Sequence, residues 1–363
     1  MLGSGTSNTL AALALRIADT YAPGDADIVI LDVFTASLDR LKKLAHVRGY
    51  AGPGNTSESR QLQKRVLRYI SAELERRSAH PHDSFAPLFV LIDGFATLRE
   101  GYSDVDDMSL IESFYQVWAK GPAMGIHCVA TTTRLKALPP AISDLTGQKW
   151  LYQLADTSEY HPTVDKDNHP ANLPGRFVST TRAHHGHVGL PDDIDAAVAA
   201  INEFWGVDGL PPLVQEFPKR VGPEQLTNCF ASGNETWQIP VGINEADLNP
   251  YVLEAFAGEH VLVSGPARSG KSTMLAAIHQ MLVQESPNTK ILVGAPRRSP
   301  LHQMLPGVMC PEQLVDVVET QSAAPEPCIV LIDDAHLVAD DSQVLARVLA
   351  LPDSPLLFNR GWA

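Results

Sequence analysis

The stretch "GPARSGKS" at residues 265–272 constrains the fold more than any other part of the chain. It fits the pattern G-x-x-x-x-G-K-[ST] in full, and it lies between an apolar run (260–264) and a helical pattern. Gly265 and Gly270 let the backbone curl so that its N–H groups point at phosphate oxygens, and the following helix adds its positive N-terminus. A strand, a phosphate loop and a helix in this order predict a nucleotide-binding α/β module with a parallel sheet.

Two side chains of this loop have predicted roles of their own. Lys271 is expected to reach the β- and γ-phosphates, and the hydroxyl of Ser272 is expected to ligate Mg²⁺. The expected ligands are therefore ATP and Mg²⁺. The other residues expected to contact the nucleotide are the rest of the loop and the start of the helix, namely Gly265, Pro266, Ala267, Arg268, Ser269, Gly270 and Thr273.

A matching acidic strand follows at "CIVLIDDAH" (328–336). Its first carboxylate, Asp333, is predicted to hold Mg²⁺ together with Ser272. Asp334 stands where many P-loop ATPases use a glutamate to polarise the attacking water, and its side chain is one methylene shorter. We therefore expect weak or partner-dependent turnover, with Lys271, Asp333 and Asp334 as the catalytic candidates. The alternative is that Asp334 is only a solvated residue at the end of a strand.

The same order of elements occurs earlier in the chain. "GSGTSNTLAALALRIA" (3–18) is followed by the apolar run 27–32, a helical pattern over 57–78 and the apolar run 87–93, which ends in aspartate. A chain of 363 residues is long enough for two such modules. The expected domains are a first module over 1–205, a Pro/Gly-rich linker over 206–224 and a second module over 225–363.

The first module lacks two of the residues that are expected to act in the nucleotide site of the second module. Gly5, Thr6 and Ser7 align with Gly270, Lys271 and Ser272, so Thr6 replaces the lysine. Gly94 likewise replaces the second acid, whereas Ser7 and Asp93 persist. Hydrolysis at this degenerate site is not expected. Two interpretations of this degenerate site remain open: a purely structural role, or weak binding of Mg-nucleotide.

Both modules are expected to lack part of their sheets. Only Met1 and Leu2 precede the first glycine loop, where the second loop has the leading strand 260–264. The second module stops soon after "LIDDAHLVADD" (331–341), with no expected counterpart to the stretch 125–179 of the first.

Several further polar residues are candidates for a functional role. Thr131–Thr133 end a predicted strand and could sense a γ-phosphate, and Arg134 could reach a neighbouring subunit's phosphate or form a local ion pair. Five closely spaced histidines are candidate zinc ligands, but their spacing favours solvated loops. These are His80, His82, His184, His185 and His187. His127 is expected in the core, and Arg297 and Arg298 in a solvated loop.

Composition excludes some classes of function. The formal net charge of −14 disfavours binding to the DNA backbone. The chain contains no apolar run long enough to span a membrane and no signal sequence, so a soluble protein is expected. Its scattered cysteines, Cys128, Cys229, Cys310 and Cys328, favour reduced thiols and a cytosolic location.

The chain resembles the FtsK/SpoIIIE branch of P-loop ATPases, and most of all the C-terminal ATPase modules of the EccC-type motor of type VII secretion. In the first module the similar stretches are "ILDVFTASLDRLKKLAHVRGYAG" (30–52), "LIDGFATLRE" (91–100), "GPAMGIHCVATTTR" (121–134) and "LPGRF" (173–177). In the second they are residues 239–273 and 331–341.

This resemblance implies two tandem RecA-like P-loop NTPase modules, hexamer-type assembly and a role in protein export. The implied partners are membrane components of the secretion machinery and small substrates of the WXG100 type. The implied location is the cytoplasmic face of the membrane, reached through a partner or a missing N-terminal part. Two alternatives remain: an FtsK-type DNA translocase, and an inactive docking module that nucleotide merely stabilises.

Overall fold

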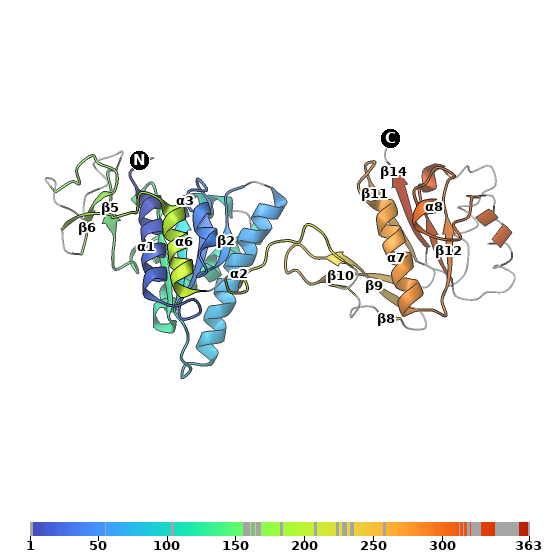
Figure 1. The fold of residues 1–363 in the computed structure, drawn as a ribbon, viewed down its shortest axis with the longest axis horizontal. Coiled ribbons are helices and arrows are strands. Elements are labelled where there is room, and N and C mark those ends of the chain that lie inside the picture. Colours follow the sequence, from blue (N-terminus) through green and yellow to red (C-terminus); the bar gives the residue numbers. More distant parts are fainter. Residues whose placement is uncertain are drawn as a thin grey trace. The chain divides into compact units, whose positions relative to one another are not determined.

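The computed structural model divides the chain into two compact units, Met1–Phe217 and Pro218–Ala363 (Figure 1). Each unit is described by itself below. The structure describes residues 3–54, 56–102, 105–154, 160, 164, 168–181, 184–206, 209–222, 225–226, 231–232, 236–256, 259–311, 313–314, 316–317, 320, 328–337 and 356–361.

The first unit is built on a parallel sheet with the strand order β2-β1-β3-β4. Its strands are β1 (Asp27–Asp32), β2 (Val47–Ala51), β3 (Leu88–Asp93) and β4 (Ile126–Ala130). The two runs expected as buried strands, 27–32 and 87–93, are the central pair, and they align from Asp27 opposite Leu88 to Asp32 opposite Asp93. Both aspartates therefore lie at the carboxyl edge of the sheet, where α/β folds bind ligands.

Helices cover both faces of this sheet (Figure 1). On one face α1 (Thr6–Thr20) packs with α6 (Ile194–Trp205) and the short helix η1 (Asp39–Lys43). On the other face α2 (Ser57–Ala79) packs with α4 (Val105–Lys120). The alternation of β1 explains the two layers, because Ile28 and Ile30 face α1 whereas Val29 and Leu31 face α2. The remaining helical segments are α3 (Phe95–Gly101), η2 (Gly121–Met124), η3 (Leu135–Ala137) and α5 (Pro140–Ser143).

A small antiparallel sheet with the order β5-β6-β7 follows in the first unit. Its strands are β5 (Trp150–Leu151), β6 (Arg176–Ser179) and β7 (His185–His187). The strand expected over 149–156 is thus short, and its last two residues lie outside the described part. The expectation that His185 and His187 lie in a loop is wrong, because they pair with Val178 and Arg176 across a hairpin.

The second unit begins with an antiparallel sheet of the order β10-β9-β8. These strands are β8 (Ala231–Ser232), β9 (Thr236–Ile243) and β10 (Pro250–Phe256). The main sheet of this unit is parallel, with the order β11-β14-β13-β12. Its elements are β11 (His260–Gly265), α7 (Lys271–Glu285), β12 (Lys290–Gly294), α8 (Leu301–Met304), β13 (Cys328–Ile332), η7 (Ala335–Leu337) and β14 (Leu356–Gly361). Of the helix expected over 311–321, the structure describes residues 311, 313, 314, 316, 317 and 320, and all of these are helical.

The last strand corrects one expectation about the second module. β14 pairs in parallel with β13 on one side and with β11 on the other. In the first unit β4 pairs in parallel with β3, the strand equivalent to β13. The closing residues therefore supply the counterpart of β4 that the sequence did not reveal. Among the described residues, β4 is the edge of its sheet on the side where the second unit places β11.

Candidate functional site

The two glycine loops have the same backbone conformation. Gly270 lies in the left-handed region (φ 93°, ψ 8°) immediately before α7, and Gly5 (φ 96°, ψ 13°) does so immediately before α1. Both helices have 15 residues, and neither has a side-chain hydrogen bond at its N-cap. The first N–H groups of a helix have no partner within it, so both N-termini present backbone donors for an anion.

The loop of the second unit is tightly curled and open to ligand. A Cβ atom at Gly265 would lie 2.8 Å from Oγ of Ser269, so the loop curls closely enough that a side chain there would displace the serine hydroxyl. Lys271 folds over the loop, and its Nζ donates to the carbonyl oxygens of Gly265 (2.9 Å) and Pro266 (2.8 Å). Residues 266–270 are exposed. Arg268 has a positive φ of 64°, which L residues other than Asn and Asp rarely adopt.

Asp333 lies at the centre of the site and is fully buried. The hydroxyl of Ser272 donates to its Oδ1 at 3.0 Å, so the two residues expected to hold Mg²⁺ are in contact. The hydroxyl of Ser299, also buried, donates to Oδ2 and accepts a hydrogen bond from the N–H of Leu301 at 3.1 Å. A serine hydroxyl from the first turn of α7 and one from the segment after β12 thus orient one carboxylate.

Asp334 follows in a left-handed conformation with a φ of 45°. Burial raises the pKa of its carboxyl above the ordinary value of 3.8, and the neighbouring charge of Asp333 raises it further. His336 and Lys271 act in the opposite direction. Gly94, the aligned residue of the first unit, has a φ of 91°. The backbone turn after the acidic strand is therefore shared, but only the second unit places a carboxylate on it.

The degenerate site of the first unit keeps the serine–aspartate pair. Ser7 Oγ donates to Oδ2 of Asp93 at 2.8 Å. Ser37 donates to the same oxygen at 3.2 Å, and Thr131 donates to Oδ1 at 2.6 Å. Three hydroxyl groups thus surround Asp93, and Thr6 provides no cation in the place of Lys271.

Two of these hydroxyls were not predicted from the sequence. Ser299 and Ser37 follow the strands beside the acidic strand, β12 and β1, and each hydrogen bonds the carboxylate of the neighbouring strand. The two serines could have been found by their equivalent positions in the two modules. The segments "APRRS" (295–299) and "DVFTAS" (32–37) each extend from the carboxyl end of a strand to a serine.

The other candidate residues do not join the site. Arg134, Arg297 and Arg298 are exposed. His127, expected in the core, is half-buried and lines a groove beside β4. No group of three or more His, Cys, Asp or Glu side chains within the described part of the chain is placed to hold a metal ion. In the same part, no helix combines the length and apolarity needed to cross a membrane.

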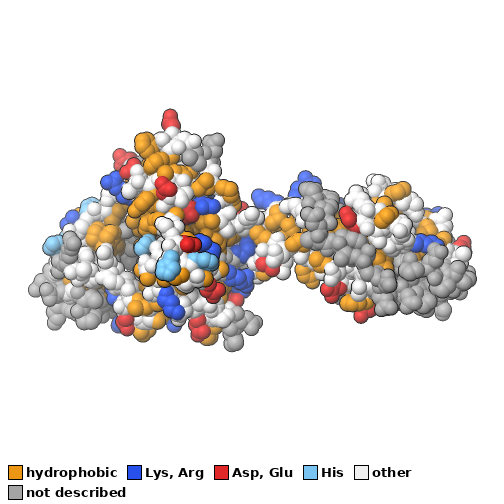
Figure 2. Space-filling view, turned by 90° about the horizontal axis from the view of Figure 1, so that it is seen from below, with side chains coloured by type: hydrophobic (Ala, Val, Ile, Leu, Met, Phe, Trp, Pro, Cys, Tyr) orange, Lys and Arg blue, Asp and Glu red, His pale blue; other side chains and the backbone are white. Residues whose placement is uncertain are grey.

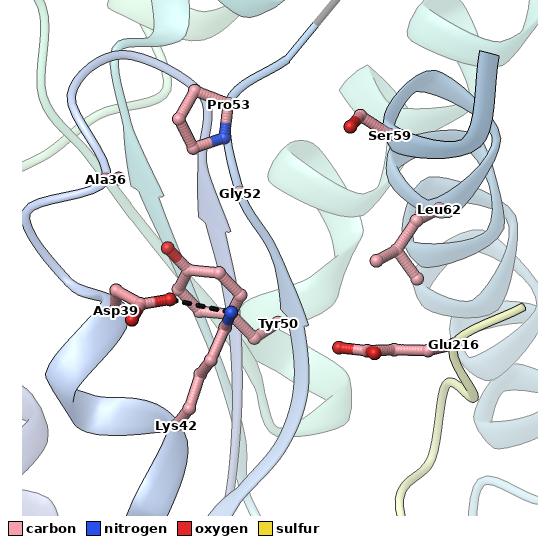
Figure 3. A pocket seen from close by; sticks show the side chains of 9 residues that line it. All are labelled: Ala36, Asp39, Lys42, Tyr50, Gly52, Pro53, Ser59, Leu62 and Glu216. Atoms are coloured by element: carbon pink, nitrogen blue, oxygen red, sulfur yellow. Dashed lines mark ion pairs between the residues drawn. The ribbon is translucent and has the colours of Figure 1, made fainter. Parts of the chain in front are cut away.

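A small cavity of about 310 Å³ lies beside the degenerate site (Figure 3). Lys42 and Asp39 form an ion pair of 2.6 Å at its wall, and the ammonium of Lys42 lies 4.2 Å from the ring centre of Tyr50. Its lysine is therefore neutralised locally. On the face shown in Figure 2, the Lys and Arg side chains of the described residues are scattered among acidic and hydrophobic ones. This distribution does not resemble the continuous basic stripe of a DNA-binding surface.

The fold and the site define the chain as a pair of tandem P-loop NTPase modules, one with a complete nucleotide loop and one with a degenerate loop. No protein-family model matches the chain. It is 28% identical over 317 residues to the ESX secretion system protein EccC of Thermomonospora curvata, covering 77% of this chain and 23% of that protein. It is 25% identical over 342 residues to the ESX-1 secretion system protein EccCb1 of Mycobacterium tuberculosis, covering 84% of this chain and 56% of that one.

A solved structure shows the same tandem arrangement of folds. ATPases 2 and 3 of Thermomonospora curvata EccC, in complex with a signal sequence peptide, match 99% of this chain and 74% of that one, with a TM-score of 0.68 and 23% identity. The expected resemblance to the ATPase modules of EccC-type secretion proteins is thus confirmed. The chain spans between about a quarter and about half of the length of the curated relatives named above.

Proposed function

We propose that this chain is an ATP-binding motor subunit of a type VII secretion-like system, with its one competent nucleotide site in the second unit. The observation that carries the proposal is the hydrogen bond between Ser272 and Asp333 directly below the loop that holds Lys271. This arrangement combines an anion-binding helix N-terminus, a lysine ammonium group at the loop and a carboxylate–hydroxyl pair that suits Mg²⁺.

Each residue of the site has a defined task in this proposal. Lys271 exchanges its two loop carbonyls for phosphate oxygens, since an ammonium group binds phosphate more strongly than it binds a neutral carbonyl. Backbone N–H groups of residues 267–273 hold the phosphates. Ser272 and Asp333 provide oxygen ligands for Mg²⁺. The bound Mg-ATP supplies the phosphoanhydride that is cleaved and the metal charge that stabilises the transition state.

Asp334 is the proposed general base that orients the attacking water. Its raised pKa brings the carboxyl closer to the range in which a base can accept a proton. Its left-handed backbone, which aspartate adopts more readily than most L residues, turns the chain at the end of the acidic strand. The shorter reach of aspartate accounts for the slow turnover that we propose.

The first unit has a structural role in this proposal. Asp93 already accepts three hydrogen bonds from protein hydroxyls, and Thr6 offers no charge to a phosphate. The second candidate function for the whole chain is an inactive docking module that hydrolyses no ATP. The first site favours this candidate, because it lacks the lysine and the second acid. A DNA translocase is disfavoured by the net charge of −14.

The relatives suggest the setting in which the motor works. They are ESX secretion system proteins, and one solved relative was captured with a signal sequence peptide. We extend this to the present chain: hexamer-type assembly at the cytoplasmic face of the membrane, contact with membrane components of the secretion machinery, and recognition of WXG100-type substrates.

Two assays test the proposal. Phosphate release from Mg-ATP should be slow but measurable for the wild type and absent for Asp334→Asn, which keeps the size of the side chain and removes its negative charge. Equal rates for the two proteins would exclude the proposed hydrolytic role. A purified WXG100-type protein should bind the chain only when its signal sequence is intact, and binding that is unchanged after removal of that sequence would refute the assignment of substrate.

A further inference from the structure

The turn between β12 and α8 carries two adjacent arginines at the edge of the nucleotide site. The N–H of Ser299 donates to the carbonyl oxygen of Pro296 at 2.9 Å, so a β-turn places Arg297 and Arg298 at its two central positions. The Nε2 of His302 donates to the same carbonyl oxygen at 3.2 Å. Two hydrogen bonds thus hold the backbone from which both guanidinium groups extend.

This turn is fastened to the centre of the site. Ser299, its last residue, is buried, and its hydroxyl donates to Oδ2 of Asp333, the carboxylate proposed to hold Mg²⁺. Consecutive Cα atoms lie about 3.8 Å apart, so Arg298 is the immediate neighbour of a residue that touches this carboxylate. The N–H of Asp333 also donates to the carbonyl oxygen of Gly294, at the end of β12, at 2.9 Å. The turn therefore lies at the carboxyl edge of the sheet, beside the proposed metal ligand.

The charges of the two arginines are not compensated within the described part of the chain. Arg297 and Arg298 are exposed, and neither side chain forms an ion pair or a hydrogen bond with another described residue. Two adjacent guanidinium groups repel each other, so a ligand of negative charge stabilises the pair. The net charge of the chain is −14, so this surplus of positive charge is local.

The first unit has no cations at the equivalent turn. Its segment after β1 also ends in a serine, Ser37, whose hydroxyl donates to the carboxylate of the acidic strand. The two residues before Ser37 are Thr35 and Ala36, whereas the two before Ser299 are arginines. The arginines therefore accompany Lys271, because the unit with the complete phosphate loop has both and the degenerate unit has neither.

Arginine at this place suits a terminal phosphate. A guanidinium group presents its N–H donors in a planar fork that binds two phosphate oxygens at once. The γ-phosphate is the group that distinguishes ATP from ADP. Asp333 and Asp334, which are proposed to hold the metal and to orient the attacking water, follow β13, the parallel neighbour of β12. The turn after β12 is thus on the side of the site where the γ-phosphate would react.

We propose that Arg297 and Arg298 bind the γ-phosphate and thereby raise the affinity of the site for ATP relative to ADP. This role rests on the proposed function, because it requires a nucleotide at the loop of the second unit. The two side chains leave solvent when ATP binds, and they lose their phosphate contact once the γ-phosphate has been released. They act by their charge and exchange no proton, since arginine stays protonated in proteins.

The test compares two nucleotides that differ by one phosphate. The whole chain is titrated, with Mg²⁺, with fluorescent derivatives of ADP and of a non-hydrolysable ATP analogue. Replacing Arg297 and Arg298 together by glutamine should weaken binding of the ATP analogue about tenfold or more and leave that of ADP within about twofold. Replacing both by lysine keeps the charge and should restore part of the difference. The matched control replaces Lys219 and Arg220 by glutamine, which removes two adjacent exposed cations of the same unit.

Every other outcome contradicts the proposal in a distinct way. Unchanged affinity for both nucleotides would exclude the arginines from the site. An equal loss for both would show that the arginines bind a phosphate that ADP also has. An equal loss of binding of the ATP analogue in the control variant would reveal a general effect of charge. A wild-type chain that binds neither nucleotide would refute the proposed function itself, and the role of the arginines with it.

Discussion

The hydroxyl of Ser272 lies 3.0 Å from Oδ1 of Asp333, and in the first unit the hydroxyl of Ser7 lies 2.8 Å from Oδ2 of Asp93. The two units thus keep the same pairing between the residue that follows the loop and the end of the acidic strand. They differ in the residue just before that serine, which is Lys271 in one unit and Thr6 in the other. Since the pairing is common to both sites, we propose that the lysine decides which of them binds a nucleotide.

Ser299 is predicted to position Asp333 for the metal. Removing its hydroxyl by Ser299→Ala leaves Oδ2 without one donor, so the Mg²⁺ concentration needed for half-maximal nucleotide binding should rise about tenfold. Ser299→Thr keeps a hydroxyl and should restore most of the affinity. The matched control is Ser37→Ala, which removes the equivalent bond to Asp93 and should leave nucleotide binding unchanged. A purely structural role for Ser299 would lower stability without changing the dependence on Mg²⁺.

The left-handed backbone at position 334 is predicted to favour glycine over alanine. Alanine at this position keeps the strained left-handed backbone without the carboxylate, whereas glycine adopts it freely. Chemical denaturation of the second unit should show Asp334→Gly to be more stable than Asp334→Ala by about 1 kcal/mol. Both variants should bind ATP and fail to hydrolyse it. Equal stabilities would show that the backbone at this position is not strained.

Gly94, the aligned glycine of the first unit, allows a second test of the turn that follows the acidic strand. A Cβ atom at Gly94 would lie 2.6 Å from Cβ of Phe34, and its φ is 91°. Gly94→Ala should therefore destabilise the first unit by about 2 kcal/mol or more, since steric conflict adds to the cost of the left-handed backbone. A change below about 0.5 kcal/mol in denaturant unfolding would contradict the shared geometry of the two turns.

The buried Asp32 predicts a pH-dependent stability of the first unit. Burial raises its pKa above the ordinary value of 3.8, against the lowering effect of hydrogen bonds from Leu38 and Tyr50. Because the folded-state pKa is raised, the ionised form opposes folding at neutral pH, and this cost disappears as the pH falls through the folded-state pKa. Asp32→Asn should therefore raise the free energy of unfolding at neutral pH, and this advantage should decline as the pH falls below the folded-state pKa of Asp32 toward its unfolded-state value. Hydrogen exchange in β1 and β3 measures it for the first unit alone.

A control separates this effect from a general response to acid. Tyr50→Phe removes a hydrogen bond that lowers the pKa of Asp32, so it should steepen the loss of stability between acidic and neutral pH. The prediction fails if Asp32→Asn changes stability equally at both pH values.

The central strands and the nucleotide loop could be predicted from the sequence because their signals are local. Runs such as 27–32 and 328–334 are apolar and end in a turn or an acid, and the structure places β1 and β13 there. The loop over 265–272 has a spacing that few other structures require. The comparison of Lys271 with Thr6 needed only the alignment of the two loops.

The missed features depend on contacts between distant segments. Ser299 and Ser37 lie in irregular turns, and only folding brings their hydroxyls to Asp333 and Asp93. The place of β14 is determined by its pairing with both β11 and β13, which lie far from it in the sequence. The exposed edge of β4 is likewise a property of sheet order, which the apolar run 125–134 does not contain.

The stoichiometry of nucleotide binding tests the central claim most directly. Equilibrium titration of the whole chain with a fluorescent ATP analogue and Mg²⁺ should give one site per chain for the wild type. Lys271→Ala should remove that site, because the cation that binds the phosphates is lost, whereas Ser7→Ala should leave it intact. Two sites in the wild type, or one site that survives Lys271→Ala and disappears with Ser7→Ala, would contradict the assignment of the competent site to the second unit.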